Sequence, residues 1–99
     1  MSLKQINISE IDELLGDVEL IDVRENDEYE EVALKHSVNI PLHELLDSPE
    51  DYLEEDKEYY ILCRAGRRSF MAALELQELG YDVVNVTGGI SEYTGKNIK

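Results

Sequence analysis

The sequence has little of what would cross-link the chain or carry it into a membrane. A single cysteine among 99 residues excludes an internal disulfide bond and a zinc site built from several thiolates. No apolar run approaches the roughly 20 residues that cross a bilayer, and the start of the chain lacks the apolar core of a signal peptide. These absences predict a cytoplasmic protein with no membrane partner.

Basic residues are also scarce. Nine Lys and Arg stand against 23 Asp and Glu, which gives a net charge of −14. A nucleic-acid interface needs clustered cations, so we expect no nucleic-acid partner. Nineteen of the acidic residues lie between Glu10 and Glu58, whereas three of the nine basic residues follow Cys63 within five positions. An acidic body with one cationic spot is suited to attracting a small anion, although the acids also serve solubility alone.

What is present fits a single globular domain. Hydrophobic residues make up 42% of the chain, too many for a disordered protein, and no linker or repeat divides it. We therefore expect residues 1–99 to form one domain. His36 and His43 lack the spacing of metal ligands, and we expect neither a metal nor another cofactor.

Short apolar strands alternate with helical segments along the chain. Because alternating strands and helices form parallel sheets covered on both faces, this order predicts an α/β fold. Ligands of such sheets gather at the carboxyl ends of the strands, and strand 59–62 runs directly into Cys63. The expected strands are 19–23, 38–40, 59–62 and 81–86, and the expected helices are 10–16 with Ser9 as its cap, 26–31, 42–46, one from Pro49, and 69–79.

The segment after Cys63 has the composition of an anion-binding loop. Gly66 allows a tight turn, and a helix that begins near Ser69 directs its positive end at the sulfur. Backbone N–H groups of residues 64–68 and the nearby arginines also favour a thiolate, the reactive form of cysteine. A cysteine after an apolar strand is otherwise usually a small buried hydrophobe. The glycine, the arginines and the helix start favour a nucleophile.

These residues resemble a known family. Cys63–Ser69 (CRAGRRS) is similar to the motif Cys-x-x-Gly-x-Arg-Ser of single-domain rhodanese-like sulfurtransferases. Leu20–Arg24 (LIDVR) and the later Asn39–Pro41 (NIP) resemble its upstream signatures, and Gly80–Ile90 continues the match downstream. The resemblance implies a rhodanese-like three-layer α/β/α fold with a central, mainly parallel five-stranded sheet.

The resemblance also implies a ping-pong reaction, in which Cys63 takes a sulfane sulfur from a donor as a persulfide and an acceptor then removes it. The implied donors are thiosulfate or a low-molecular-weight persulfide, and the acidic surface is suited to a basic sulfur-relay protein. Asp22 and Arg24 are interpreted as a structural ion pair. Cys63 is the expected catalytic residue, and the expected substrate-binding residues are Arg64, Ala65, Gly66, Arg67, Arg68 and Ser69. Arg68 has an alternative role, which is to tie the loop down.

Two departures from the family occur outside the loop. The family usually has Gly-His-Ile and then Gly-Ala before Asn-Ile-Pro, whereas this chain has Val32–Ser37 (VALKHS). Its common tryptophan after Gly-Gly is replaced by Tyr93. These changes bear on substrate recognition and packing more than on the chemistry at Cys63.

Two other functions remain open. Rhodanese-like phosphatases have His-Cys with five residues before the arginine, but here Leu62 replaces the histidine and four residues separate Cys63 from Arg68. A shorter loop suits a sulfur atom better than a phosphoryl group, and no general acid is evident. A non-catalytic binding module is the other alternative, although such modules commonly lack the cysteine that this chain keeps.

Overall fold

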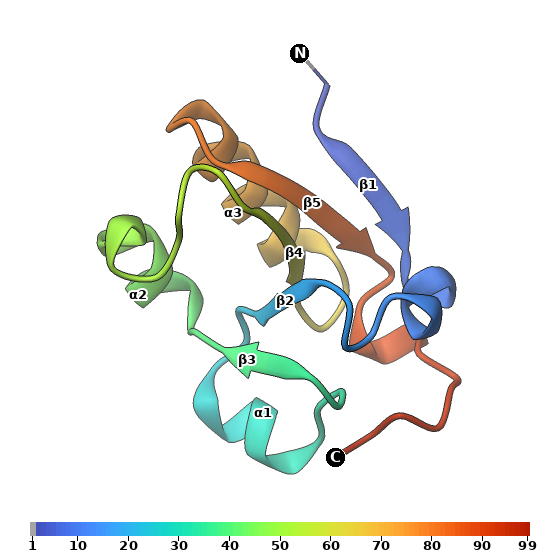
Figure 1. Ribbon diagram of the computed structural model, residues 1–99. Coiled ribbons are helices and arrows are strands. Elements are labelled where there is room, and N and C mark those ends of the chain that lie inside the picture. Colours follow the sequence, from blue (N-terminus) through green and yellow to red (C-terminus); the bar gives the residue numbers. More distant parts are fainter. Residues whose placement is uncertain (1) are drawn as a thin grey trace.

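The computed structural model describes residues 2–99 and contains a five-stranded sheet in the order β1-β5-β4-β2-β3. All four neighbouring strand pairs are parallel, which confirms the predicted sheet. The sheet runs through the middle of the molecule (Figure 1). Its strands are β1 (Lys4–Asn7), β2 (Glu19–Asp22), β3 (Ser37–Asn39), β4 (Glu58–Leu62) and β5 (Asp82–Thr87).

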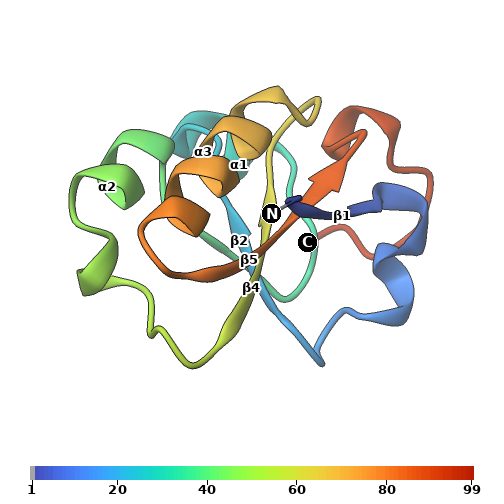
Figure 2. The same cartoon turned by 90° about the horizontal axis from the view of Figure 1, so that it is seen from above.

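Helices of two kinds form the outer layers. Two α-helices lie on one face of the sheet, and two 3-10 helices lie on the other face (Figure 2). The two outer layers therefore contain helices of different kinds. The α-helices are α1 (Asn26–Glu31), α2 (Leu42–Asp47) and α3 (Arg67–Glu78), and the 3-10 helices are η1 (Ile8–Glu13), η2 (Pro49–Asp51) and η3 (Ile90–Glu92). Within residues 2–99, no helix has the length and apolar character needed to span a membrane.

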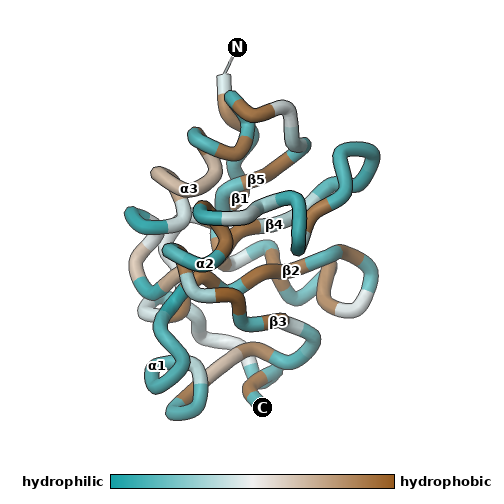
Figure 3. The backbone as a smooth tube through the Cα atoms, turned by 90° about the vertical axis from the view of Figure 1, so that its left-hand side faces the viewer, coloured by the Kyte–Doolittle hydropathy of each residue, from teal (hydrophilic) through white to brown (hydrophobic). Residues whose placement is uncertain are grey.

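The sheet separates two hydrophobic clusters. On one face, α2 contributes Leu45 and α3 contributes Ala72, Ala73 and Leu76, and this cluster also contains Cys63. On the other face, Ile8 and Ile11 of η1 pack against Leu20, Leu62 and Val86. Hydrophobic residues lie along β2 and β4, whereas α1 is hydrophilic throughout (Figure 3). Both clusters bury apolar surface against the strands, which stabilises the sheet that carries Cys63.

Most helix and strand positions follow the sequence prediction to within one residue, although the short 3-10 helix η3 was not predicted, and three other differences have a clear physical reason. Strand β1 was not predicted, because its sequence KQIN has one apolar residue and no clear alternation. The first helix is a 3-10 helix capped by Asn7 instead of Ser9, since Asn7 and Glu10 form a reciprocal capping box. Helix α3 begins at Arg67, two residues before the predicted start, because Gly66 turns the chain directly into it.

The two departures from the family pattern have visible consequences. His36 adopts a φ of +67°, a conformation that favours glycine. Ser37 and Leu34 hold this segment together through a hydrogen bond of 2.7 Å from Oγ to the carbonyl. The hydroxyl of Tyr93 donates to Asp12 Oδ1 at 2.6 Å and accepts the Asn97 N–H at 3.0 Å, so it links η1 to the C-terminal segment.

Candidate active site

Cys63 lies at the point where the strand order of the sheet reverses. From β2 the chain adds β3 on one side, and from β4 it adds β5 on the other. The carboxyl ends of β2 and β4 are therefore neighbours at a switch point, the usual position of ligands in open parallel sheets. Cys63 follows the last residue of β4 directly, and the Val23 N–H donates to the Leu62 carbonyl at 2.8 Å beside it.

The loop after Cys63 directs backbone N–H groups at the sulfur. Gly66 adopts a φ of +95° and lets the chain turn back into α3. As a result, the Gly66 N–H donates to Cys63 Sγ at 3.1 Å and the Ser69 N–H donates at 3.3 Å. The N-terminus of a 12-residue helix adds a positive potential at the same place. This arrangement stabilises negative charge on the sulfur.

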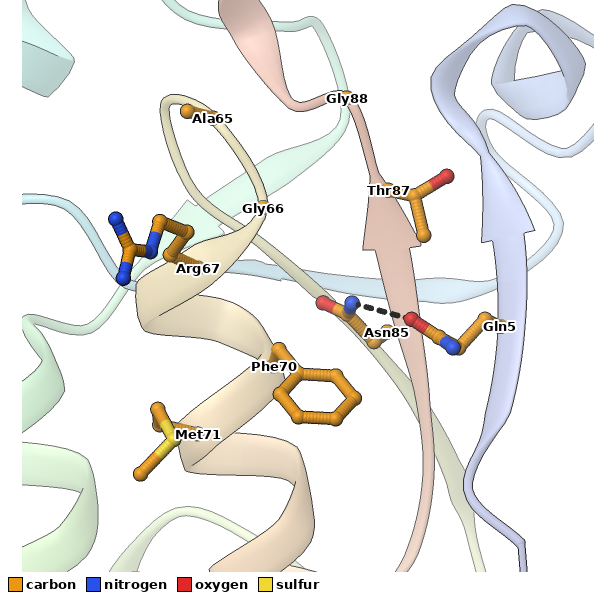
Figure 4. Close-up of a pocket in the computed structure, with 9 residues that line it drawn as sticks. All are labelled: Gln5, Ala65, Gly66, Arg67, Phe70, Met71, Asn85, Thr87 and Gly88. Atoms are coloured by element: carbon orange, nitrogen blue, oxygen red, sulfur yellow. Dashed lines mark hydrogen bonds between the residues drawn. The ribbon is translucent and has the colours of Figure 1, made fainter.

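The sulfur lies beneath the loop. Cys63 is 1% exposed, and it lines neither of the two hollows that flank the loop. One hollow, of about 380 Å³, lies between α3 and β5 and includes Arg67 and Phe70 (Figure 4). The other, of about 420 Å³, lies toward α1 and includes Arg64 and Glu31. A molecule that reacts with Cys63 therefore reaches it only when the residues above it shift.

The turn Gly88–Gly89 supports the loop from behind. The Ile90 N–H donates to the Cys63 carbonyl at 3.0 Å, and the Ser91 N–H donates to the Arg64 carbonyl at 2.8 Å. Gly89 has a φ of +62° and a ψ of −169°, and a Cβ at this position would overlap the Arg64 carbonyl. Gly88 lines the hollow beside α3. The turn therefore both borders a hollow and fixes the backbone carbonyls of Cys63 and of the next residue.

The Ser69 hydroxyl binds a partner that sequence reasoning did not identify. It donates to Asn85 Oδ1 at 2.6 Å, and Asn85 Nδ2 donates in turn to Gln5 Oε1 at 3.0 Å. Asn85 is 1% exposed in β5, between apolar residues that are also buried. A lone amide in such an apolar strand was the available signal, because a buried polar group requires a hydrogen-bond partner.

Two ion pairs lie between the sheet edge and α1, and one of them holds the loop. The Arg68 guanidinium binds both carboxylate oxygens of Glu28, at 2.8 and 3.0 Å. These hydrogen bonds lower the pKa of Glu28 from 4.5 to about 2. Arg68 thus takes the alternative of tying the loop down. The second pair, Asp22 with Arg24, is 2.8 Å long and almost fully buried, as interpreted from the sequence.

The remaining two arginines are exposed. Arg64 and Arg67 form no ion pair with any residue in the range 2–99, and each lines one of the two hollows. Ala65 lines the same hollow as Arg67. The structure therefore brings together all seven residues of the predicted site, with backbone groups facing the sulfur and two free cations facing solvent.

Comparisons with known proteins agree with this geometry. The protein-family model described as "Rhodanese-like domain" matches residues 7–96 of this chain. The chain is 34% identical over 99 residues to "Putative sulfurtransferase YtwF" of Bacillus subtilis, covering 97% of this chain and 95% of that protein. It is 42% identical over 78 residues to "Putative sulfur carrier protein YrkF" of the same species, covering 78% of this chain and 42% of that longer protein.

The fold is also found among solved structures. A rhodanese-like domain protein from Staphylococcus aureus superposes with a TM-score of 0.87 at 26% identity, covering 98% of this chain and 97% of that one. A protein from Staphylococcus saprophyticus gives a TM-score of 0.88 at 27% identity, covering 98% and 99%. The chain belongs to the rhodanese-like domain family.

Proposed function

We propose that the protein is a sulfurtransferase that carries a sulfane sulfur on Cys63 as a persulfide. The observation that carries this proposal is the convergence of the Gly66 and Ser69 N–H groups on Cys63 Sγ at the N-terminus of α3. Backbone donors that already face the sulfur stabilise its anionic form. The names of the relatives, a sulfurtransferase and a sulfur carrier, support the same chemistry.

The reaction has two steps. The Cys63 thiolate attacks the outer sulfur of a donor such as thiosulfate, an S–S bond forms, and the bond to the sulfite group breaks with its electron pair leaving on sulfite. The persulfide then holds the sulfur until an acceptor nucleophile, such as cyanide or a thiol, attacks the outer sulfur and releases the Cys63 thiolate. No metal or cofactor takes part in this scheme.

The loop residues have two kinds of role: some attract the sulfur donor, and others hold the loop around the sulfur. Arg64 and Arg67 are exposed and unpaired within residues 2–99, so they attract an anionic donor to an otherwise acidic protein. Ala65 and Gly66 line the hollow beside α3, and Gly66 donates its N–H to the sulfur, while Arg68 and Ser69 fix the loop through Glu28 and Asn85. The donor is therefore thiosulfate or a small anionic persulfide, and residues 1–99 act as one rhodanese-like domain.

Intact mass spectrometry tests the proposal. The full chain is incubated with thiosulfate, or with a low-molecular-weight persulfide, and separated from the excess. We expect a gain of one sulfur atom that cyanide removes as thiocyanate. The adduct is expected to be absent in Cys63→Ser, which replaces the only thiol of the chain.

Mass spectrometry and two activity measurements separate the alternative functions. No adduct with either donor, or equal thiocyanate formation by the wild type and Cys63→Ser, would favour a binding module over a sulfurtransferase. Steady hydrolysis of an aryl phosphate that is lost in Cys63→Ser would instead favour a phosphatase.

A further inference from the structure

A buried line of hydrogen bonds leads from Cys63 to the surface of the sheet. Cys63 Sγ lies 3.3 Å from Ser69 Oγ, which lies 2.6 Å from Asn85 Oδ1, and Asn85 Nδ2 lies 3.0 Å from Gln5 Oε1. Ser69 and Asn85 are 0% and 1% exposed, whereas Gln5 is exposed. The line therefore connects the reacting sulfur to solvent through neutral groups alone.

Strand register brings its members together. Gln5 of β1 is the direct partner of Asn85 in β5. Val83 belongs to the cluster beneath α3, and residues two apart in a strand share a face, so Asn85 also faces α3. The amide nitrogen of Asn85 is turned toward Gln5, and its oxygen is turned toward α3 (Figure 4).

In this arrangement the hydrogen bonds run in one direction. Ser69 has one hydroxyl hydrogen, and its contact with Asn85 Oδ1 is much shorter than the 3.3 Å contact with the Gly66 carbonyl. That carbonyl already accepts the Phe70 N–H. Ser69 Oγ therefore offers only lone pairs to Cys63, and it accepts a hydrogen bond from the S–H group. The direction of the hydrogen bonds in the structure is therefore the one that a neutral Cys63 thiol requires.

The same four residues also satisfy the opposite direction. An amide exchanges its donor and acceptor ends when it turns by about 180°. If both amides turn, Gln5 Nε2 donates to Asn85 Oδ1, Asn85 Nδ2 donates to Ser69 Oγ, and the Ser69 hydroxyl donates to an anionic sulfur. No buried polar atom of the line loses its partner in either direction, so neither direction carries the penalty of an unsatisfied group.

We propose that the Cys63–Ser69–Asn85–Gln5 line reverses its hydrogen-bond direction when Cys63 becomes an anion, which makes Asn85 and Gln5 positioning residues for the nucleophile. The thiol hydrogen leaves to solvent, and the Ser69 hydrogen stays on its oxygen and only rotates. Ser69 then adds a third donor to the two backbone N–H groups that already face the sulfur. This inference rests on the proposed role of Cys63 as a nucleophile.

Charged groups around Cys63 also influence its ionisation, and an experiment must distinguish their effect from the effect of the hydrogen-bonded line. Arg68 interacts electrostatically with Cys63, and its partner Glu28 offsets part of its charge. Lys4 and Asp82, on β1 and β5, pair with each other away from the loop. Other charged groups near the loop include Asp22 at the end of β2 and Arg24 after it, Glu31 of α1 in the hollow that Arg64 lines, Arg67 at the start of α3, and Glu92 in η3; the acids Glu19, Glu58, Glu75 and Glu78 lie on β2, β4 and α3.

Substitutions at the exposed end of the line set its direction without touching the core. Gln5→Glu leaves only acceptors for Asn85 Nδ2, which holds the line in the thiol direction. Gln5→Lys leaves only donors for Asn85 Oδ1, which holds it in the thiolate direction. The measurement is the rate of iodoacetamide alkylation of the single cysteine across pH. The plateau rate reports access to the buried sulfur, and the midpoint reports its charge.

We expect the midpoint of Gln5→Glu to lie above that of Gln5→Lys by about one pH unit, the size of one hydrogen bond to a charged sulfur. Asn85→Asp, which offers only acceptors to Ser69, is expected to raise the midpoint further. Because the introduced charges also act through space, both Gln5 variants are repeated with Ser69→Ala. That change removes the hydroxyl and keeps the Ser69 backbone N–H.

The proposal requires the difference between the Gln5 variants to fall by at least half in the Ser69→Ala background. An equal difference in both backgrounds would overturn it, because the charges would then act through space alone. Identical midpoints in the two Gln5 variants would overturn it as well. Alkylation needs no sulfur donor, so a failure here is distinguishable from a failure to load sulfur on Cys63.

Discussion

The two sides of the Cys63 loop are held by different kinds of interaction. Toward α1 the loop is held by a charged contact, since Arg68 binds Glu28, and a second ion pair, Arg24 with Asp22, joins the neighbouring end of β2 to the same helix. Toward β5 they are neutral: backbone N–H groups of residues 90 and 91 bind loop carbonyls, and Ser69 binds Asn85. An ion pair has a fixed polarity, whereas an amide or hydroxyl can donate or accept. The charged side fixes where the loop lies, and the neutral side adapts to the charge of the sulfur.

The two ion pairs on the charged side differ in burial. Asp22 and Arg24 are 0% and 3% exposed, whereas the side chains of Glu28 and Arg68 are 27% and 37% exposed. Arg24 also donates to the Glu28 and Val32 carbonyls, so it joins the end of β2 to the middle and the C-terminal end of α1. A buried charge that loses its partner is much more costly than a solvated one. The difference predicts unequal effects when either pair is broken.

Removal of the buried carboxylate is expected to have the largest effect. Asp22→Asn preserves the shape of the side chain and leaves Arg24 charged and buried without a counterion. We expect a loss of about 4 kcal/mol in the free energy of unfolding, measured by urea denaturation at neutral pH. Addition of Arg24→Met removes the unpaired charge, so the double variant should recover part of the loss. A loss no greater than the ~1 kcal/mol of an exposed pair would show that water reaches Arg24.

The neutral side is tested by Gly89→Ala. The added methyl group would meet the Arg64 carbonyl, and the backbone at φ +62° and ψ −169° is almost restricted to glycine. We expect a loss of about 3 kcal/mol from strain and overlap. The alkylation rate of Cys63 should also change, because the turn fixes the carbonyls of Cys63 and Arg64.

Gly80→Ala is the matched control for that substitution. Gly80 has a φ of +102°, but apart from its two chain neighbours no residue in the described range 2–99 lies within 4 Å of where its Cβ would be. Its expected loss is about 1 kcal/mol from backbone strain alone, and Cys63 should alkylate as in the wild type. Equal losses at the two glycines would mean that the overlap with the loop is relieved without cost.

The loop itself was predictable because its chemistry is local in sequence. An apolar strand, a glycine and a helix start within Glu58–Glu78 determine which backbone groups face Cys63. Parallel pairing followed from the same alternation of strands and helices. These features depend on residues within a few positions of one another, which is the range over which sequence patterns are informative.

The partners of the loop were less accessible to prediction. Glu28 lies 40 residues from Arg68, and although Glu28 and Tyr29 resemble part of the family's first signature, nothing in that pattern names the partner of Glu28. Gln5 lies 80 residues from Asn85 and belongs to the strand that was not predicted. Ser69 was expected to bind substrate, and the partner of its hydroxyl, Asn85, was not predicted. Register and packing determine these contacts.

The smallest expected effect is that of the partly exposed pair. Glu28→Gln keeps the side-chain shape and removes the charge that binds Arg68, and we expect a loss of about 1 kcal/mol at neutral pH. Because the pKa of Glu28 is about 2 in the folded state against an ordinary 4.5, its stabilisation is complete above pH 4.5 and declines as the pH falls toward 2. The unfolding free energies of the wild type and the variant should therefore converge over this interval.

Glu30→Gln controls for the change in net charge, because Glu30 is an exposed residue of the same helix that forms no ion pair within residues 2–99. It should show no such convergence with the wild type. If instead the Glu28→Gln and wild-type curves stayed parallel down to pH 2, the pair with Arg68 would not contribute to stability. The charged side would then depend on the buried Asp22–Arg24 pair alone, and Arg68 would be free to meet an anionic sulfur donor together with Arg64 and Arg67.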